Sequence, residues 1–202
     1  MLLCFSFLIA CPKHHHHHPN FNTINAIYSF EEVDFNQTDE NTLVIFDIDD
    51  TLIFDSYKKC PAVLVEPIII SIMKKLRMHR VSTIGLTAIK TGKVPGLNMP
   101  FADWRIADLK KAGIIFNDPF KKTITFNHLK NRPLLKAGII FTAWHDKGEM
   151  LKKVFSKTGC SFNKIIFFDD TEKNIASVSR AAEDLGVAFR GYIYKGVKSK
   201  LK

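Results

Sequence analysis

Short apolar runs separated by helical patterns are the feature of this sequence that most restricts its fold. Five such runs occur, at residues 43–48, 81–87, 137–143, 164–169 and 187–194. The first four are nearly continuous in Val, Ile, Leu and Phe, which is typical of strands buried on both faces. Amphipathic stretches at residues 66–79, 101–112, 147–157 and 171–185 lie between the runs and predict helices. This alternation predicts a mainly parallel sheet in a single three-layer α/β/α domain of the Rossmann-like type, over residues 21–202.

Two weaker patterns lie outside the predicted core. Residues 123–126 and the strand at Ala137 flank a loop that contains Pro133, and we expect a hairpin there before the third core strand. Residues 26–30 are apolar enough to dock on the domain as a short element.

Residues 1–20 are predicted to be a signal-like or lipoprotein-like segment with a His-rich tract. The apolar run 1–10 is about half the length that a membrane-crossing helix needs, and it resembles the core of a secretory signal. Residues 8–11 resemble a bacterial lipobox, after which Cys11 would carry a lipid anchor. No Lys or Arg precedes the run, so a frayed terminus is the alternative. We expect an exported protein, periplasmic or extracellular, or a cytoplasmic one if the signal does not function.

Five consecutive histidines at residues 14–18 allow more than one interpretation. A metal-binding tract, a purification tag and disordered low-complexity sequence all fit the pattern. We assign the run no catalytic role.

Charge and composition narrow the classes of protein and partner. The chain has 29 Lys+Arg against 20 Asp+Glu, 46% hydrophobic residues and 24% charged residues, which excludes a disordered chain and a polytopic membrane protein. The net charge of +9 suits an anionic partner. Because basic residues are spread along the chain rather than interleaved with aromatic ones on one element, we do not expect nucleic-acid binding.

Polar side chains gather where the predicted strands end. In open α/β sheets, ligands bind beyond the carboxyl ends of the strands. The residues at these ends are Asp47, Asp49, Asp50 and Thr51 after the first strand, Thr87 after the second, Lys147 after the third, and Asp169 and Asp170 after the fourth. Carboxylates this close repel one another unless a cation lies between them, and oxygen ligands favour Mg²⁺. We therefore expect a Mg²⁺ site that faces an anion held by Lys147 and Thr87.

These motifs resemble those of the haloacid dehalogenase (HAD) superfamily of phosphohydrolases. VIFDIDDTL is similar to its first motif, and Thr87, Lys147 and FFDD are similar to the next three, in the same order along roughly residues 41–194. The stretch GIIFTAWHDKGEML, FFDD and the closing GYIY are also similar to a little-characterised group of secreted bacterial HAD-like proteins related to acid phosphatases.

The resemblance implies a role for each site residue. Asp47 would be the nucleophile and would form an aspartyl-phosphate. Asp49 would protonate the leaving oxygen and then activate water. Thr87 and Lys147 would hold the phosphoryl oxygens. Mg²⁺ would be held by Asp47, the Asp49 carbonyl oxygen, Asp169 and Asp170, with Asn174 as a candidate for positioning the acidic motif.

The predicted function is Mg²⁺-dependent hydrolysis of a small phosphomonoester. The intervals from Thr51 to Thr87 and from Thr87 to Lys147 leave room for only a minimal cap, so the substrate stays undetermined, as does the choice of water or an alcohol as acceptor. Trp144 and His145, beside Lys147, are candidates for lining the entrance. A catalytically weak HAD-fold protein that binds a partner or host molecule is the alternative.

Overall fold

The computed structural model describes residues 22–54, 62–96 and 98–197. Its strands are β1 (Thr23–Ile27), β2 (Thr42–Phe46), β3 (Ser82–Thr87), β4 (Ile124–Thr125), β5 (Leu134–Lys136), β6 (Ile139–Phe141), β7 (Lys164–Asp169) and β8 (Ala188–Tyr194). Its helices are α1 (Ile68–Met78), α2 (Phe101–Lys111), α3 (Lys147–Thr158) and α4 (Glu172–Asp184), with a short 3-10 helix, η1 (Phe30–Glu32). From β2 to β8 the helices alternate with strands, as the apolar pattern predicts, except that three short strands, β4, β5 and β6, lie between α2 and α3.

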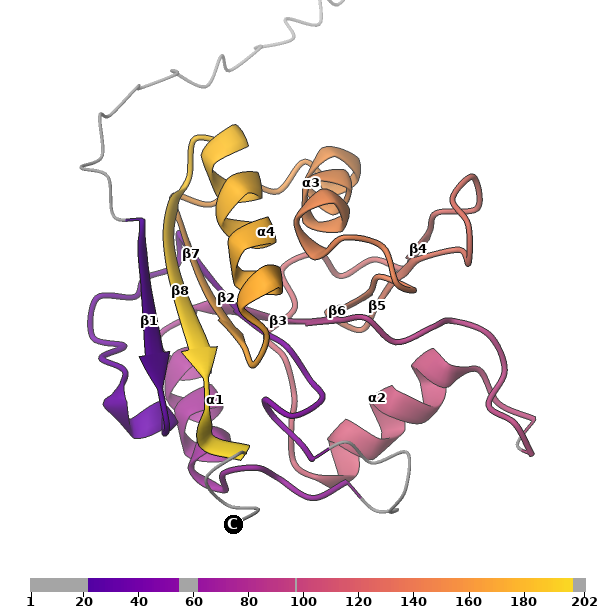
Figure 1. The fold of residues 1–202 in the computed structure, drawn as a ribbon, viewed down its shortest axis with the longest axis horizontal. Coiled ribbons are helices and arrows are strands. Elements are labelled where there is room, and N and C mark those ends of the chain that lie inside the picture. The colour runs from indigo at the N-terminus through magenta and orange to yellow at the C-terminus, as the bar shows by residue number, and fades with distance from the viewer. Residues whose placement is uncertain (1–21, 55–61, 97, 198–202) are drawn as a thin grey trace, which may run out of the picture.

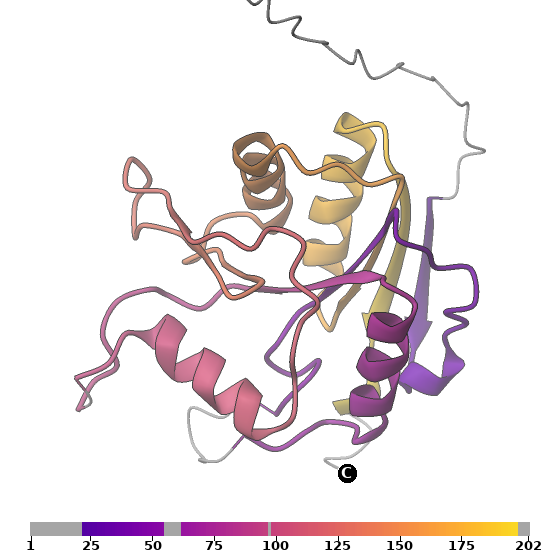
Figure 2. The ribbon, with the colours of Figure 1, turned by 180° about the vertical axis from the view of Figure 1, so that it is seen from behind.

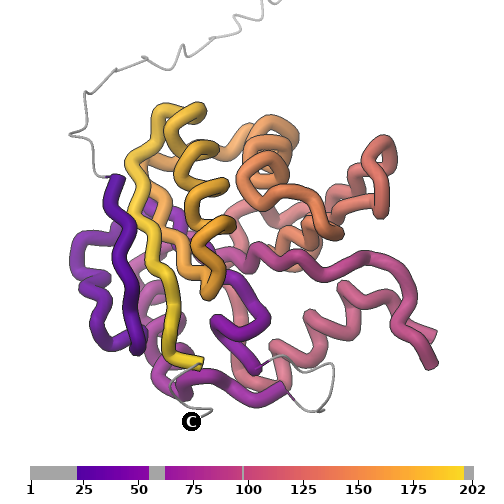
Figure 3. Tube along the Cα trace, viewed as in Figure 1, coloured from indigo at the N-terminus to yellow at the C-terminus, as the bar shows by residue number. Residues whose placement is uncertain are grey.

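The eight strands form one sheet in the order β1-β8-β7-β2-β3-β6-β5-β4. The six strands from β1 to β6 in that order run parallel, and β5 and β4 join the far edge in antiparallel pairing. The first and last strands of the chain, β1 and β8, lie side by side at one edge (Figures 1 and 3). This arrangement brings the carboxyl ends of β7, β2, β3 and β6 next to one another.

Helices on both faces of the sheet make the fold a three-layer α/β/α Rossmann-like one (Figures 1 and 2). Successive residues of β2 point to opposite faces, so Leu43 and Ile45 pack in one core and Val44 and Phe46 in the other. The first core contains apolar residues of α3 and α4, and the second contains those of α1 and α2. Burial on both faces explains why these strands read as continuous apolar runs.

The edge of the sheet beyond β6 differs from the prediction. Residues 137–143 were expected to form one core strand, but β6 covers only Ile139–Phe141, because Ala137 and Gly138 form a tight turn with φ of 51° and 72°. A hairpin was expected between residues 123–126 and the strand at Ala137, and it forms with the preceding strand, β5, instead. β4 pairs with β5, and β5 in turn pairs with β6.

The amino-terminal predictions fall partly outside the described residues. The signal-like segment and the histidine run, residues 1–20, lie outside them. The expected short element at residues 26–30 corresponds to the end of β1 and the start of η1, where Ser29 and Glu32 form a capping box. Within the described ranges, no helix has the length and apolar character that crossing a membrane requires.

Candidate functional site

The predicted site residues lie together because four parallel strands end at one edge of the sheet. β2 is paired with β7 on one side and with β3 on the other, and β3 is paired with β6. Asp47 follows β2, while Asp169 and Thr87 are the last residues of β7 and β3. Lys147 begins α3, the helix that follows β6. The edge therefore carries two acids, one hydroxyl and one amine from separate parts of the chain.

The turn after β2 is fixed by backbone hydrogen bonds. The Asp47 amide donates to the Phe168 carbonyl at 2.8 Å, which extends the pairing with β7 by one residue. The chain then turns through Asp50, whose φ of 57° lies in the left-handed region that Asp tolerates better than most residues. The buried Thr51 hydroxyl lies 3.4 Å from Asp47 Oδ2. Asp47 thus sits on a rigid strand end, and Asp50 is a turn residue.

Lys147 is placed by the first turn of α3. Asp146 caps this helix by accepting a hydrogen bond from the Glu149 amide at 3.0 Å. Partial burial acts to raise the pKa of Asp146, but the hydrogen bonds from the Ser177 hydroxyl and then from the Glu149 amide lower it. The Gly148 amide donates to Ser177 Oγ of α4 at 2.9 Å. These contacts fix the start of α3 against α4, and with it the base of the Lys147 side chain.

The Lys147 ammonium group bridges the two buried acids. Nζ contacts Asp47 Oδ1 and lies 2.7 Å from Asp169 Oδ2. The other oxygen of Asp169 accepts hydrogen bonds from the Thr171 amide at 2.8 Å and from Asn174 Nδ2 at 3.0 Å. Asn174 therefore contacts Asp169 of the acidic motif, and its role in positioning that acid stays a prediction.

The protonation of this cluster follows from its burial. Burial raises the pKa of Asp47 to about 8, and the nearby Asp169 carboxylate acts in the same direction, against the lowering effect of Lys147. Burial alone would lower the pKa of Lys147, but the carboxylates of Asp47 and Asp169 together raise it. Lys147 therefore stays charged, and its single charge is shared between two acids.

Three acids at this edge could hold a metal ion. Asp47, Asp169 and Asp170 each offer a carboxylate oxygen, and these three oxygens lie within 4.8 Å of one another. Burial, and then the Asp169 carboxylate, raise the pKa of Asp170 as well. A cation between these groups would offset both their repulsion and the cost of burying them ionised. The predicted ligation by the Asp49 carbonyl oxygen stays a prediction.

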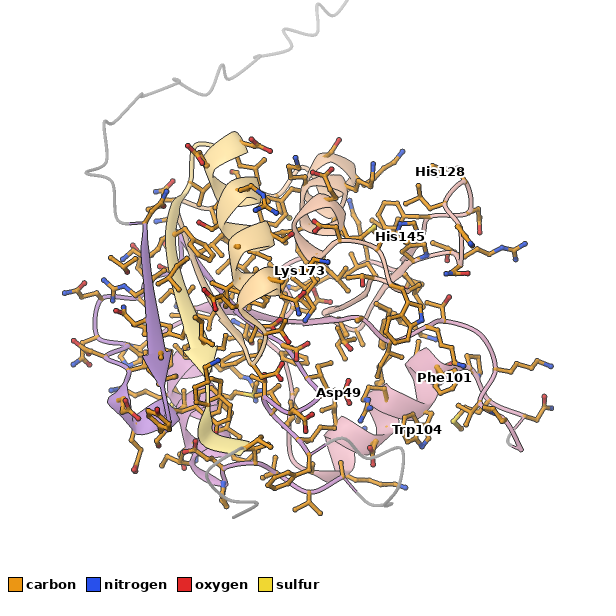
Figure 4. All side chains as sticks on the ribbon, viewed as in Figure 1. Asp49, Phe101, Trp104, His128, His145 and Lys173 are labelled. Atoms are coloured by element: carbon orange, nitrogen blue, oxygen red, sulfur yellow. The ribbon has the colours of Figure 1, made fainter. Side chains whose placement is uncertain are left out.

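Asp49 and Thr87 form a second contact beside this cluster. Thr87 Oγ1 lies 3.4 Å from Asp49 Oδ2 and also accepts a hydrogen bond from the Ile89 amide at 3.2 Å. Thr87 is buried, whereas the Asp49 side chain is 24% exposed. Figure 4 shows Asp49 at the end of the sheet, facing helix α2 with Phe101 and Trp104.

Sequence reasoning missed one residue of the site, Arg105 of α2. Its Nη2 lies 2.6 Å from Asp49 Oδ1, and the side chain is fully buried. A usable signal was present, because Arg105 and Asp108 share helical spacing with the apolar residues Phe101 and Leu109. Charged side chains on the buried stripe of a helix indicate partners in the interior.

Trp144 and His145 lie in the loop between β6 and α3. The Trp144 amide donates to the carbonyl of Ala88, next to Thr87, and the residue is 71% exposed. His145 Nε2 lies 2.7 Å from the Lys130 carbonyl oxygen. The backbone of Trp144 therefore lies against the residue that follows Thr87, while the His145 ring is held against the loop that follows β4.

Comparison with known proteins shows that the chain matches one family model. A family model described as "Protein of unknown function (DUF2608)" matches residues 54–202. The matched range contains Thr87, Lys147, Asp169 and Asp170, and it begins after Asp47 and Asp49. No curated protein matches the chain.

Proposed function

We propose a function for this chain, which belongs to the DUF2608 family of proteins of unknown function, on the geometry of its site. The function is Mg²⁺-dependent hydrolysis of a small phosphomonoester through an aspartyl-phosphate. The observation that carries the proposal is the contact of Lys147 Nζ with both Asp47 and Asp169, with Asp170 beside them, at the carboxyl ends of adjacent strands. The order of the motifs, which resembles that of the HAD superfamily, supports the same reaction.

The first half of the reaction transfers the phosphoryl group to the protein. A carboxylate oxygen of Asp47 attacks phosphorus while the bond from phosphorus to the leaving oxygen breaks. Asp49, two residues further along the chain, donates its proton to that oxygen, so that an alcohol and an aspartyl-phosphate result. Lys147 and Thr87 hold the phosphoryl oxygens as their charge redistributes.

The second half releases phosphate. The Asp49 carboxylate accepts a proton from a water molecule that attacks the phosphorus of the aspartyl-phosphate. The acyl-phosphate bond breaks, phosphate leaves, and Asp47 returns to a carboxylate. Asp49 regains the proton that it gave up in the first half, so both residues end as they began.

The donor set fits a hard divalent cation. The candidate ligands that Asp47, Asp169 and Asp170 offer are all carboxylate oxygens, and oxygen ligands favour Mg²⁺. When bound there, Mg²⁺ would supply positive charge that keeps Asp47 ionised and offsets its repulsion of an anionic ester. Without such a cation, burial favours the protonated form of Asp47, which is not a nucleophile.

Steady-state assays with an aryl phosphate and a panel of small phosphomonoesters test the proposal, with Mg²⁺ and with a chelator. We expect turnover with Mg²⁺ alone. Asp47→Asn should lower kcat/KM by about 10³-fold or more, because an amide cannot replace the nucleophile. Transient transfer of one phosphoryl group to the wild-type chain should be detectable by mass after acid quenching.

Asp50→Asn is the matched control. It makes the same chemical change three residues away, and Asn also tolerates the left-handed backbone of this turn. Its activity should stay within about threefold of wild type. Full activity of Asp47→Asn would disprove the assignment of the nucleophile. Failure of the wild-type protein to turn over any ester with Mg²⁺ would leave the binding-protein alternative.

A further inference from the structure

The guanidinium group of Arg105 is held from three directions inside the protein. Nη2 lies 2.6 Å from Asp49 Oδ1, and Nη1 lies 3.6 Å from Asp108 Oδ2. The Trp104 ring lies beneath it, with Cζ 4.8 Å from the ring centroid. The Arg105 side chain has no exposed surface. A group fixed in this way can impose a definite orientation on whatever it binds.

The two oxygens of the Asp49 carboxylate contact different residues. Oδ1 faces the guanidinium of α2, and Oδ2 faces the Thr87 hydroxyl at 3.4 Å. Thr87 is the residue to which the proposed function assigns a phosphoryl oxygen. Oδ1 thus attaches the carboxyl group to α2, and Oδ2 is the oxygen on the side of the residue proposed to hold the phosphoryl group.

Burying an arginine is costly, and this one is placed where sheet and helix meet the site. Desolvation of a guanidinium is offset only when its charge is paired and hydrogen-bonded. Other contacts already attach α2 to the fold, among them Phe101, Ala102 and Leu109 in the core and the ion pair between Asp103 and Lys136 of β5. Contact with Asp49 is what distinguishes Arg105 from these attachments.

We propose that Arg105 is a positioning residue that aims Asp49 Oδ2 at the leaving oxygen of the ester. The inference rests on the proposed function and adds α2 to its machinery. In the first half of the reaction the proton moves from Asp49 Oδ2 to the leaving oxygen as the phosphorus–oxygen bond breaks, and Arg105 holds the resulting carboxylate through Oδ1. Without Arg105, the carboxyl group can rotate away from the ester.

Leaving-group dependence measures this role directly. An aryl phosphate such as p-nitrophenyl phosphate releases a stable anion and needs little proton transfer, whereas an alkyl phosphate such as glycerol phosphate releases a strongly basic alkoxide unless it is protonated. General acid catalysis contributes about 10²–10⁴-fold. In Arg105→Gln, we expect kcat/KM for the alkyl ester to fall about 10²-fold more than kcat/KM for the aryl ester.

The ratio of the two kcat/KM values is independent of how much of a preparation is folded, because both are measured on the same protein. Arg105→Lys retains the charge but not the planar fork of donors. Its ratio of kcat/KM for the alkyl and aryl esters should therefore lie between those of Arg105→Gln and wild type. If Arg105→Gln does not fold, Arg105→Lys carries the test through the same ratio. The double variant Asp49→Asn/Arg105→Gln should have the ratio of Asp49→Asn alone, since Arg105 acts through Asp49.

Lys136→Gln is the matched control. Lys136 Nζ lies 2.5 Å from Asp103 Oδ1, so this change removes an ion pair that attaches the same helix without touching Asp49. Its ratio should equal that of wild type. An equal loss for both esters in Arg105→Gln and Arg105→Lys, with an active wild-type protein, would overturn the positioning role alone. A wild-type protein inactive on both esters would instead overturn the proposed function.

Discussion

At the scale of single residues, the charge around Lys147 determines how the site receives a cation. Its one ammonium group contacts two buried carboxylates, those of Asp47 and Asp169. One of the two is therefore in excess, and burial raises the pKa of Asp47 to about 8. Burial therefore favours a proton on Asp47 in the metal-free protein, and a cation bound there would compete with that proton.

The affinity for Mg²⁺ should therefore depend on pH. An acid with a raised pKa releases its proton only as the pH approaches about 8, and carboxylate ligands must be deprotonated to bind. We expect the Kd for Mg²⁺ to tighten by up to about tenfold per pH unit between pH 6 and 8 and to level off above that range. Isothermal titration calorimetry in buffers of different ionisation enthalpy measures both Kd and the protons released.

Asp47→Asn provides the comparison. It should bind Mg²⁺ more weakly and with a shallower dependence on pH, because the displaced proton is gone. A wild-type Kd that is constant from pH 6 to 8 would show that Asp47 is already ionised in the metal-free protein.

At the scale of secondary-structure elements, the close approach of α3 and α4 sets the position of Lys147. A Cβ atom on Gly148 would lie 2.3 Å from the Ser177 carbonyl oxygen and 2.8 Å from Ser177 Oγ. Both distances are far inside van der Waals contact, so only glycine allows the first turn of α3 to meet α4 here.

Gly148→Ala should therefore separate the two helices. We expect the free energy of unfolding to fall by about 1–3 kcal/mol, the usual cost of overpacking, and the proposed phosphatase activity to fall with it as Lys147 shifts. Chemical denaturation and steady-state kinetics measure the two effects. Gly92→Ala is the control, since a Cβ there meets no atom within 4 Å, and its stability should change by less than about 0.5 kcal/mol. Wild-type stability of Gly148→Ala would contradict the close approach.

The residues at the strand ends could be predicted from the sequence. For α2, the bounds could be predicted but the contact with Asp49 could not. Parallel strands place their carboxyl ends at one edge, so Asp47, Thr87 and Asp169 could be grouped without a structure. The helical pattern also predicted α2 within one residue of its bounds. However, the spacing of apolar residues in a helix does not show which strand end the helix packs beside. The contact between Arg105 and Asp49 depends on that position.

Very short strands limited the rest of the prediction. β5 has three residues and β4 two, which is too few for a periodic pattern to stand out. β1 has four exposed residues out of five, so its apolar signal is weak. Its place in the sheet comes from pairing with β8, at the other end of the chain.

At the scale of the whole molecule, a buried carboxyl group joins the two ends of the described chain. Glu66 precedes α1 and is 7% exposed. Its side chain accepts hydrogen bonds from Ser29 Oγ at 2.7 Å and from the Tyr194 hydroxyl at 2.5 Å. Burial, together with the Glu66 carboxylate, raises the pKa of Tyr194, so the phenol stays a donor over the whole physiological range.

Tyr194→Phe should weaken this connection. Removing one donor from a buried carboxyl group costs about 1–3 kcal/mol, so the free energy of unfolding should fall by that amount. Urea denaturation followed by circular dichroism measures it. Tyr28→Phe is the matched control, because Tyr28 is 61% exposed and loss of its hydroxyl should change stability by less than about 0.5 kcal/mol. Equal stability of the two variants would mean that the hydrogen bond to Glu66 contributes nothing.

The parallel pairing of β1 also determines where the start of this strand lies relative to the candidate site. Thr23 begins a strand that runs parallel to β8 and β7, so it lies at the amino ends of these strands, whereas Asp169 ends β7 at the opposite, carboxyl end. A molecule attached to a surface, a bead or a fusion partner through that end would present its acidic edge outward. Immobilisation through the amino-terminal side should thus leave the candidate site accessible to the esters of the proposed reaction, whereas attachment near Lys147 would obstruct it.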